Sequence, residues 1–473
     1  MEFAKKIMVV LAVLVLGGEG MLPGKVGGLT VKQEEELSRE VLQVIFQRYE
    51  IIDDPVVVPY VSQVGHRILA HLPEQPFEYH FYVIKEHDFN AFATPAGHIF
   101  VNSGLFAAME NEEELAGILA HEIAHVYCRH ISQKIERSKK IGIATLAGIA
   151  AGILLGAGGA GDAAQAVTMG SMAAGQSAEL AYSREDEMQA DQLGLQYLSQ
   201  AGYGANGLLA ILRKIRGQQW FGSGQIPTYL STHPAVEERI VYIDSWIGAQ
   251  SGRPKKRLGE NPENFGRAHT QLVIRYGDER AVLKQFETAL RQHPEDPLAH
   301  YRYGLILAQM GKRQDAIGQI RTALAKRAFD PHILKDLGRI YFLDGQYPEA
   351  LNLLQSAHNL IADDPECLFF LGRTQIELGQ HKAATAIFLD LADKYPDYKE
   401  PFYFLSESYG QQGNLAQAHY YRGVYYDKKR EYAAAATQLQ RALRYAENPA
   451  EKQKIEALLQ DIEKKLARSR KRE

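Results

Sequence analysis

The chain has 473 residues, of which 46% are hydrophobic and 23% are charged, and its formal net charge is −4. This length predicts roughly two to four domains, and the composition excludes a disordered chain. A small negative net charge does not attract a polyanion, so we expect no nucleic-acid partner. The chain has only two cysteines, which excludes a disulfide framework.

The first twenty residues have the pattern of a secretory signal. Lys5 and Lys6 precede an unbroken apolar run over residues 7–16, and a flexible stretch rich in glycine follows at 17–20. The run is shorter than the ~20 residues that span a bilayer. We therefore predict a cleaved signal peptide over residues 1–20 and export of the rest of the chain.

Two kinds of apolar pattern follow the signal. Residues 30–75 have a mostly helical period, which predicts packing helices. From Tyr79 the pattern shortens to strands, and Pro95-Ala96-Gly97 separates two apolar runs, which predicts a small sheet with a hairpin. The stretch 90–101 is either an exposed edge onto which an extended peptide adds as a strand, or an internal hairpin covered by its own domain.

The next predicted element is a long helix over residues 112–140, and it contains the motif His121-Glu-Ile-Ala-His125. Residues four apart project from one face of a helix, so both imidazoles can bind one metal ion. Neutral imidazole with carboxylate suits zinc, which takes three protein ligands and water in a catalytic site. Glu122 can then take a proton from the water and deliver it to the leaving amine. The alternative is a pair of surface histidines on an amphipathic helix.

A charge-free stretch rich in alanine and glycine follows at residues 141–160. Its length is that of a membrane span, but a single crossing would place the two halves of the proposed metal site on opposite sides of the bilayer. We therefore expect a buried or mobile helical hairpin near the active site, and peripheral contact with a membrane surface is the alternative.

A second predicted helix, over residues 182–191, carries two acidic residues at the same four-residue spacing. Glu187 is the candidate third ligand, and the alternative is a carboxylate on the helix surface. Asp191 lies one turn further along and can accept a hydrogen bond from the free ring nitrogen of a ligand histidine. His130, off the face that carries the two motif histidines, is expected at the surface.

His233 follows this helix, in the sequence Ser-Thr-His-Pro, where Pro234 keeps the preceding backbone extended. Two roles fit. His233 could donate a hydrogen bond to the oxyanion of the tetrahedral intermediate, or it could occupy the fourth zinc position in place of water and keep the enzyme inactive. The need to restrain a protease favours the second role, that of a latch.

Past residue 260 the chain repeats with a period of 34 residues. The glycine, alanine and proline positions that keep this register are Gly304, Gly338 and Gly372; Gly311, Gly345, Gly379 and Gly413; Ala316, Ala350, Ala384 and Ala418; and Pro297, Pro331 and Pro365. A helix-turn-helix unit of this length is similar to the tetratricopeptide repeat, and small residues let paired helices approach closely. A charged helix over 451–468 is the expected capping element.

Taken together, the motifs resemble peptidase family M48, in its periplasmic members that carry tetratricopeptide repeats. The resemblance rests on His121-Glu-x-x-His125, on Ser183-Arg-x-x-Glu187-x-x-Ala-Asp191, on Thr232-His-Pro with Arg239-Ile240, and on Asn90-Ala-Phe-Ala before a Pro/Gly turn. It implies zinc bound by His121, His125 and Glu187, with Glu122 as catalytic base and His233 near the metal. It also implies quality control of outer-membrane proteins in the periplasm of a Gram-negative bacterium, with the outer-membrane assembly machinery as partner.

We therefore expect an α+β zincin-like metallopeptidase domain over residues 30–250, a linker over 248–263, and an all-α tetratricopeptide-repeat solenoid over 264–468. The expected function is zinc-dependent hydrolysis of internal peptide bonds in misfolded or stalled envelope proteins, with repeats that recruit substrate or assembly machinery. The main alternative is a chaperone or assembly factor that binds unfolded polypeptides through its repeats and cleaves rarely. A second is an adaptor with a structural metal site, but a structural zinc needs no base such as Glu122.

Overall fold

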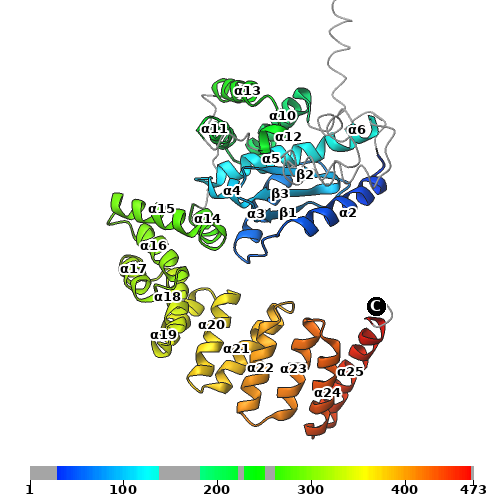
Figure 1. Cartoon of the computed structure of the whole chain (residues 1–473), viewed down its shortest axis with the longest axis vertical. Helices are drawn as coiled ribbons and strands as arrows, with labels where there is room; N and C mark the ends of the chain where they lie inside the picture. Colours follow the sequence, from blue (N-terminus) through cyan, green and yellow to red (C-terminus); the bar gives the residue numbers. More distant parts are fainter. Residues whose placement is uncertain (1–28, 138–181, 222–227, 251–261, 470–473) are drawn as a thin grey trace, which may run out of the picture. The chain divides into compact units, whose positions relative to one another are not determined.

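The computed structural model describes residues 29–137, 182–221, 228–250 and 262–469 (Figure 1). Its contacts divide the chain into two compact units, residues 1–277 and residues 278–473. The predicted signal peptide, the apolar segment at 141–160 and most of the predicted linker lie outside the described residues. Within the described ranges, no helix is long and apolar enough to cross a membrane.

The first unit contains a three-stranded mixed sheet with the order β1-β3-β2. The strands are β1 (His80–Ile84), β2 (Ala91–Thr94) and β3 (His98–Asn102). β2 and β3 form the predicted hairpin, in which Phe92 faces Phe100 across an antiparallel pair. The turn between them contains Ala96 and Gly97 with positive φ angles of 61° and 90°. β1 pairs with β3 in parallel, an arrangement that the sequence pattern did not predict.

Helices cover both faces of this sheet (Figure 1). α2 (Val31–Arg48) packs Leu37, Val41 and Ile45 on the strand residues Ile84, Phe92 and Phe100. α3 (Val57–Leu69) packs on the opposite face of β1, so closely that a Cβ at Gly65 would overlap the ring of Phe81. Among its described residues, the unit has the further helices α4 (Ser103–Ala107), α5 (Glu112–Tyr127), α6 (His130–Arg137), α10 (Arg184–Gln200), α11 (Asn206–Phe221), α12 (Thr228–Thr232), α13 (Val236–Ala249) and α14 (Pro262–Tyr276).

α5 is the central helix of the unit, and nearly all of its residues are buried. Asn111 caps its first turn, where its side chain accepts a hydrogen bond from the backbone N–H of Glu114. The helix packs against α10 and α11 as well as the sheet. Gly194 on α10 allows this, because a Cβ there would lie 3.2 Å from the carbonyl oxygen of Ala120.

The helix predicted over residues 112–140 is interrupted, which corrects that prediction. α5 ends at Tyr127, Arg129 takes a left-handed conformation with φ of 56°, and α6 begins at His130. A non-glycine residue in this region carries a conformational cost. Arg129 is held there by contacts with Glu34 of α2 and with the carbonyl oxygen of Leu29. No glycine or proline marks this break in the sequence, so the helical spacing alone did not reveal it.

The second unit is an array of helix pairs, as predicted. Its helices are α15 (Glu279–Gln292), α16 (Pro297–Gln309), α17 (Arg313–Lys326), α18 (Pro331–Leu343), α19 (Tyr347–Leu360), α20 (Pro365–Glu377), α21 (His381–Lys394), α22 (Glu400–Gln411), α23 (Leu415–Lys428), α24 (Tyr432–Tyr445) and α25 (Pro449–Ser469). An aspartate caps each helix that begins with a repeat proline, as Asp296 does for α16. A Cβ at Gly304 would lie 2.4 Å from Ile320, which shows how closely paired helices approach.

α14 belongs to the first unit, although the repeat domain was predicted to begin at residue 264. Phe265 of α14 packs edge-on against Tyr60 of α3, with ring centroids 6.4 Å apart, and against Phe106 of α4. Leu272 is buried. His269 Nε2 lies 2.9 Å from the carbonyl oxygen of Ala107. α14 therefore completes the core that carries the sheet.

We expect a fragment of residues 21–277 to fold, and one that ends at residue 255, within the predicted linker, to be much less stable. The shorter fragment loses the buried side chains of Phe265 and Leu272, and burial of each stabilises by ~1.5–3 kcal/mol, so its free energy of unfolding should fall by roughly 3–6 kcal/mol. Urea unfolding of both fragments measures the difference. Equal midpoints would show that α14 is dispensable for this core.

Candidate metal centre

Two helices and one turn bring the predicted site residues together. His121 and His125 project from one face of α5, and Glu187 and Asp191 from the facing side of α10. His233 directly follows α12. Its backbone N–H donates to the carbonyl oxygen of Tyr229, and its ring stacks on the Tyr229 ring with centroids 4.3 Å apart.

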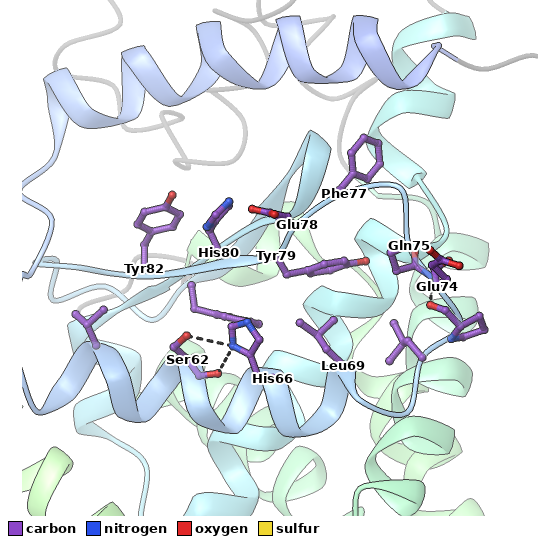
Figure 2. Close-up of a pocket in the computed structure, with 14 residues that line it drawn as sticks. Ser62, His66, Leu69, Glu74, Gln75, Phe77, Glu78, Tyr79, His80 and Tyr82 are labelled. Atoms are coloured by element: carbon purple, nitrogen blue, oxygen red, sulfur yellow. Dashed lines mark hydrogen bonds between the residues drawn. The ribbon is translucent and has the colours of Figure 1, made fainter.

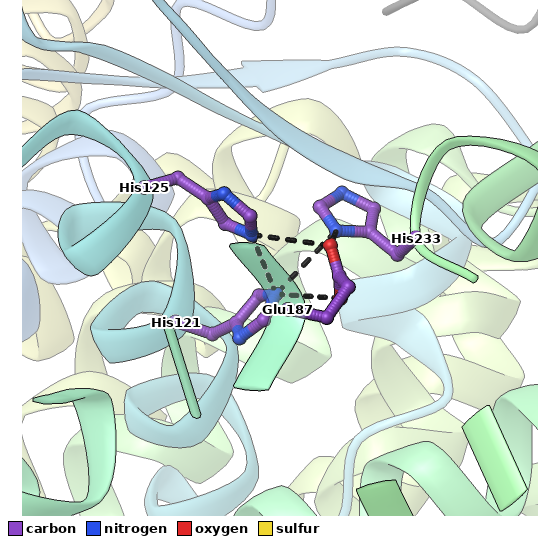
Figure 3. Close-up of side chains that lie close together, drawn as sticks. All are labelled: His121, His125, Glu187 and His233. Carbon is purple, nitrogen blue, oxygen red and sulfur yellow. Dashed lines mark hydrogen bonds and ion pairs between the residues drawn. The ribbon is translucent and has the colours of Figure 1, made fainter. Parts of the chain in front are cut away.

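Four side chains converge on one point in the interior: His121, His125, Glu187 and His233 (Figure 3). His121 Nε2 lies 3.0 Å from His125 Nε2 and 3.4 Å from His233 Nδ1. The Glu187 carboxylate lies 3.0 Å from His233 Nδ1 and 3.4 Å from each of the other two imidazoles. All four side chains are buried.

The donor set fits a zinc ion. Zinc binds imidazole nitrogen and carboxylate oxygen at ~2.0–2.2 Å in a tetrahedron, where neighbouring ligand atoms are ~3.3 Å apart. The separations of 3.0–3.4 Å are of this size. Nitrogen lone pairs and carboxylate oxygens that converge without solvent repel one another unless protons or a cation lie between them. The cluster is therefore a candidate metal site.

Asp191 lies beside a histidine of the motif. One of its carboxylate oxygens is 2.9 Å from His121 Nδ1, on the side of the ring away from the cluster. In the metal-free protein, burial opposes the charged form of His121, but hydrogen bonds to Asp191 and Glu187 raise its pKa to about 9. Binding of a metal would therefore displace a proton from His121.

Arg239 is a buried member of this site whose role the sequence analysis missed. From the first turn of α13, its Nε and Nη2 atoms each donate to Asp191 over 2.8 Å, and its Nη1 lies 2.6 Å from Glu187. Burial alone would raise the pKa of both carboxyls, but the Arg239 guanidinium helps to hold the pKa of Glu187 well below its usual range and lowers that of Asp191. The signal was present: two buried carboxylates on one helix face require a compensating cation.

Glu122 is fully buried beside the cluster but is not part of it. Its nearest basic group is His233, whose Nε2 lies 3.6 Å from Oε1 of Glu122. Neither carboxylate oxygen of Glu122 has a hydrogen-bond partner among the described residues. Burial raises the pKa of this carboxyl, which brings it closer to the range in which a general base both accepts and releases a proton.

His130 is buried, which corrects the expectation of a surface position. Only 2% of its surface is exposed. Its Nδ1 lies 3.0 Å from Nδ1 of His125, and its Nε2 lies 3.0 Å from the side-chain oxygen of Gln189. The break at Arg129 is the reason: in an unbroken helix, a residue five positions after His125 would project away from it.

A cavity of about 610 Å³ lies elsewhere in the first unit, between α3 and the segment that leads into β1 (Figure 2). None of the converging residues lines it. Ser62 and His66 face each other there, with Ser62 Oγ 3.2 Å from His66 Nδ1. His66 Nδ1 also lies 2.8 Å from the carbonyl oxygen of Ser62. A carbonyl oxygen can only accept, so His66 Nδ1 carries a proton and cannot activate the Ser62 hydroxyl. We therefore place the candidate chemistry at the buried cluster.

Comparisons with known proteins found matches for both parts of the chain. Residues 58–247 match the family model Peptidase family M48, and residues 281–310, 307–365 and 341–403 match models named Tetratricopeptide repeat. The chain is 30% identical over 295 residues to the putative beta-barrel assembly-enhancing protease of Vibrio cholerae, a match that covers 62% of this chain and 60% of that protein. It is 28% identical over 255 residues to the beta-barrel assembly-enhancing protease of Escherichia coli, covering 54% and 51%.

A third relative is the mitochondrial metalloendopeptidase OMA1 of Schizosaccharomyces pombe, 29% identical over 191 residues, with 40% of this chain and 52% of that protein covered. The chain thus matches between half and three fifths of the length of these relatives. The family match spans α3 to α13, which includes every residue of the cluster. Residues 58–247 are therefore a domain of peptidase family M48, and tetratricopeptide repeats follow it in the chain.

Proposed function

We propose that the chain is a zinc-dependent endopeptidase. The observation that carries the proposal is the convergence of His121, His125 and Glu187 with the unpartnered carboxylate of Glu122 directly beside them. Zinc in such a site supplies Lewis-acid chemistry, because it acidifies water and polarises a carbonyl group. His121, His125 and Glu187 would hold it, and Asp191 and Arg239 orient two of these ligands.

Glu122 is the proposed general base. It is held on α5 between the two motif histidines, and no described side chain makes a hydrogen bond to its oxygens. From there it can take the proton of the attacking water and pass it to the leaving amine. A site that served only structure would not need this buried carboxyl, which has no hydrogen-bond partner among the described residues and whose burial is costly. Glu122 therefore favours the peptidase over an adaptor with a structural metal.

β2 is the proposed docking edge for an extended polypeptide. It lies at one edge of the described sheet, but each of its four residues is at most 1% exposed, backbone included, so a peptide could pair with it only after the cover of this edge moves aside. Thr94 and Pro95, at the end of β2, line a small cavity together with His125 and Tyr182. A peptide that pairs with β2 would be held by backbone hydrogen bonds, which tolerate many sequences, and would pass close to the ligand His125.

His233 is the proposed latch. Its Nδ1 lies among the ligand atoms, 3.0 Å from Glu187 and 3.4 Å from His121. A fourth protein ligand would exclude the water that hydrolysis needs. Its Nε2, which has no hydrogen-bond partner among the described residues, faces Glu122 and leaves the oxyanion role open as the alternative.

The substrates proposed for this chain are misfolded or stalled envelope proteins, in the periplasm of a Gram-negative bacterium. The support is the signal-like N-terminus and the similarity to proteins named beta-barrel assembly-enhancing protease in Vibrio cholerae and Escherichia coli. The repeats would recruit substrate or the outer-membrane assembly machinery. A chaperone that binds unfolded polypeptides through its repeats and cleaves rarely is the second candidate.

Degradation of an unfolded test protein, with and without a chelator, tests the proposed activity. We expect cleavage at internal bonds by the purified chain, loss of cleavage when the chelator removes the metal, and recovery when Zn²⁺ is returned. Mass spectrometry of the products identifies the bonds. Binding of the unfolded protein without any metal-dependent cleavage would favour the chaperone.

A further inference from the structure

His130 forms a chain of polar contacts that runs outward from the metal cluster. Its ring is perpendicular to that of His125, with centroids 5.0 Å apart, and the two Nδ1 atoms are 3.0 Å apart. His125 Nε2, the other nitrogen of that ring, points into the cluster. Because one of two facing Nδ1 atoms must donate and the other accept, this contact decides which nitrogen of His125 carries a hydrogen.

The contacts on the outer side of His130 determine which of the two Nδ1 atoms donates and which accepts. Its Nε2 lies 3.0 Å from the side-chain oxygen of Gln189 and 3.9 Å from a carboxylate oxygen of Asp186. An ionised carboxylate only accepts, so both neighbours favour a hydrogen on Nε2 of His130. The neutral ring then has a lone pair on Nδ1, which accepts the Nδ1 hydrogen of His125. His125 is left with a lone pair on Nε2, the atom that faces the cluster.

We propose that His130 is a positioning residue for the metal: it accepts the Nδ1 hydrogen of His125 and so fixes the ring and tautomer in which His125 Nε2 is free to bind the ion. This role rests on the metal site proposed above. The two motif histidines then differ, because His121 is oriented by the carboxylate of Asp191 and His125 by a neutral imidazole.

Zinc affinity of the full chain tests this role, measured by competition with a chromophoric chelator. His130→Leu should bind Zn²⁺ ~10–100-fold more weakly, the usual effect of removing a partner of a ligand histidine. His130→Asn should retain most of the affinity, because its amide oxygen can accept in the place of Nδ1. The spectrum of bound Co²⁺ should change in the leucine variant alone.

His98→Leu is the matched control, since His98 is a half-buried histidine of β3 outside the cluster. If the leucine variant does not fold, His130→Gln replaces it: its amide reaches the place of Nε2 rather than Nδ1, so it should lose the affinity that asparagine retains. Zinc binding by the wild-type chain and equal binding by every His130 variant would overturn the positioning role and leave the metal site standing. A wild-type chain that binds no zinc would overturn both.

Discussion

Replacement of Glu122 by glutamine is expected to lower peptide hydrolysis by ~10²–10⁴-fold, the usual contribution of a general base. Glutamine has the shape of glutamate but cannot take a proton from water. The side chain contributes no hydrogen bond to another described residue, so the fold should tolerate the change. Zinc content should also be unchanged, because Glu122 lies beside the converging ligand atoms without being one of them.

The measurement is the rate of cleavage of an unfolded protein by variants with equal metal content. Glu185→Gln provides the matched control, because it makes the same chemical change at an exposed position of α10. Full turnover by a metal-loaded Glu122→Gln chain would rule out this mechanism, and some other group would have to move the proton.

His233→Ala is expected to increase the basal cleavage of unfolded protein, including cleavage of the chain's own repeats. Its Nδ1 lies among the ligand atoms, so its removal would free a position for water. If the latch is closed in about nine molecules of ten, its removal would raise the cleavage rate about tenfold. Alanine also leaves a gap against the Tyr229 ring, so the melting temperature of the variant must be measured beside its rate.

The alternative role predicts the opposite sign. Removal of a residue that donates to the oxyanion usually lowers the rate by ~10²–10³-fold. His71→Ala, at an exposed position after α3, controls for loss of a histidine in general. A large loss of activity with zinc still bound would assign His233 to the transition state and end the latch hypothesis.

Much of the residue cluster could be predicted because its residues come in pairs that are close in the sequence. His121 and His125, like Glu187 and Asp191, are four residues apart on one helix, and that spacing alone places each pair on one face. The repeat array was predictable for a similar reason, since its period is written in the sequence as glycines, alanines and prolines.

What could not be predicted depends on contacts between distant segments. The left-handed turn at Arg129 is stabilised by Glu34 of another helix, and nothing near Arg129 marks it. Because the sequence analysis did not predict that turn, it also did not predict that His130 is buried against His125. The parallel pairing of β1 with β3 and the packing of α14 on α3 are likewise choices among partners far apart in the chain, which local propensity does not specify.

The order of the cluster residues along the chain has a consequence for biosynthesis. His121 and His125 come first, Glu187 follows, and His233 and Arg239 come last, so the complete set exists only in a chain made beyond residue 239. A ribosome or translocase delivers residues from the N-terminus onward, at ~5–20 per second during synthesis. A nascent chain therefore passes through a period in which the two histidines of α5 are present without their carboxylate and arginine, and whatever chemistry the full cluster performs can begin only when that period ends.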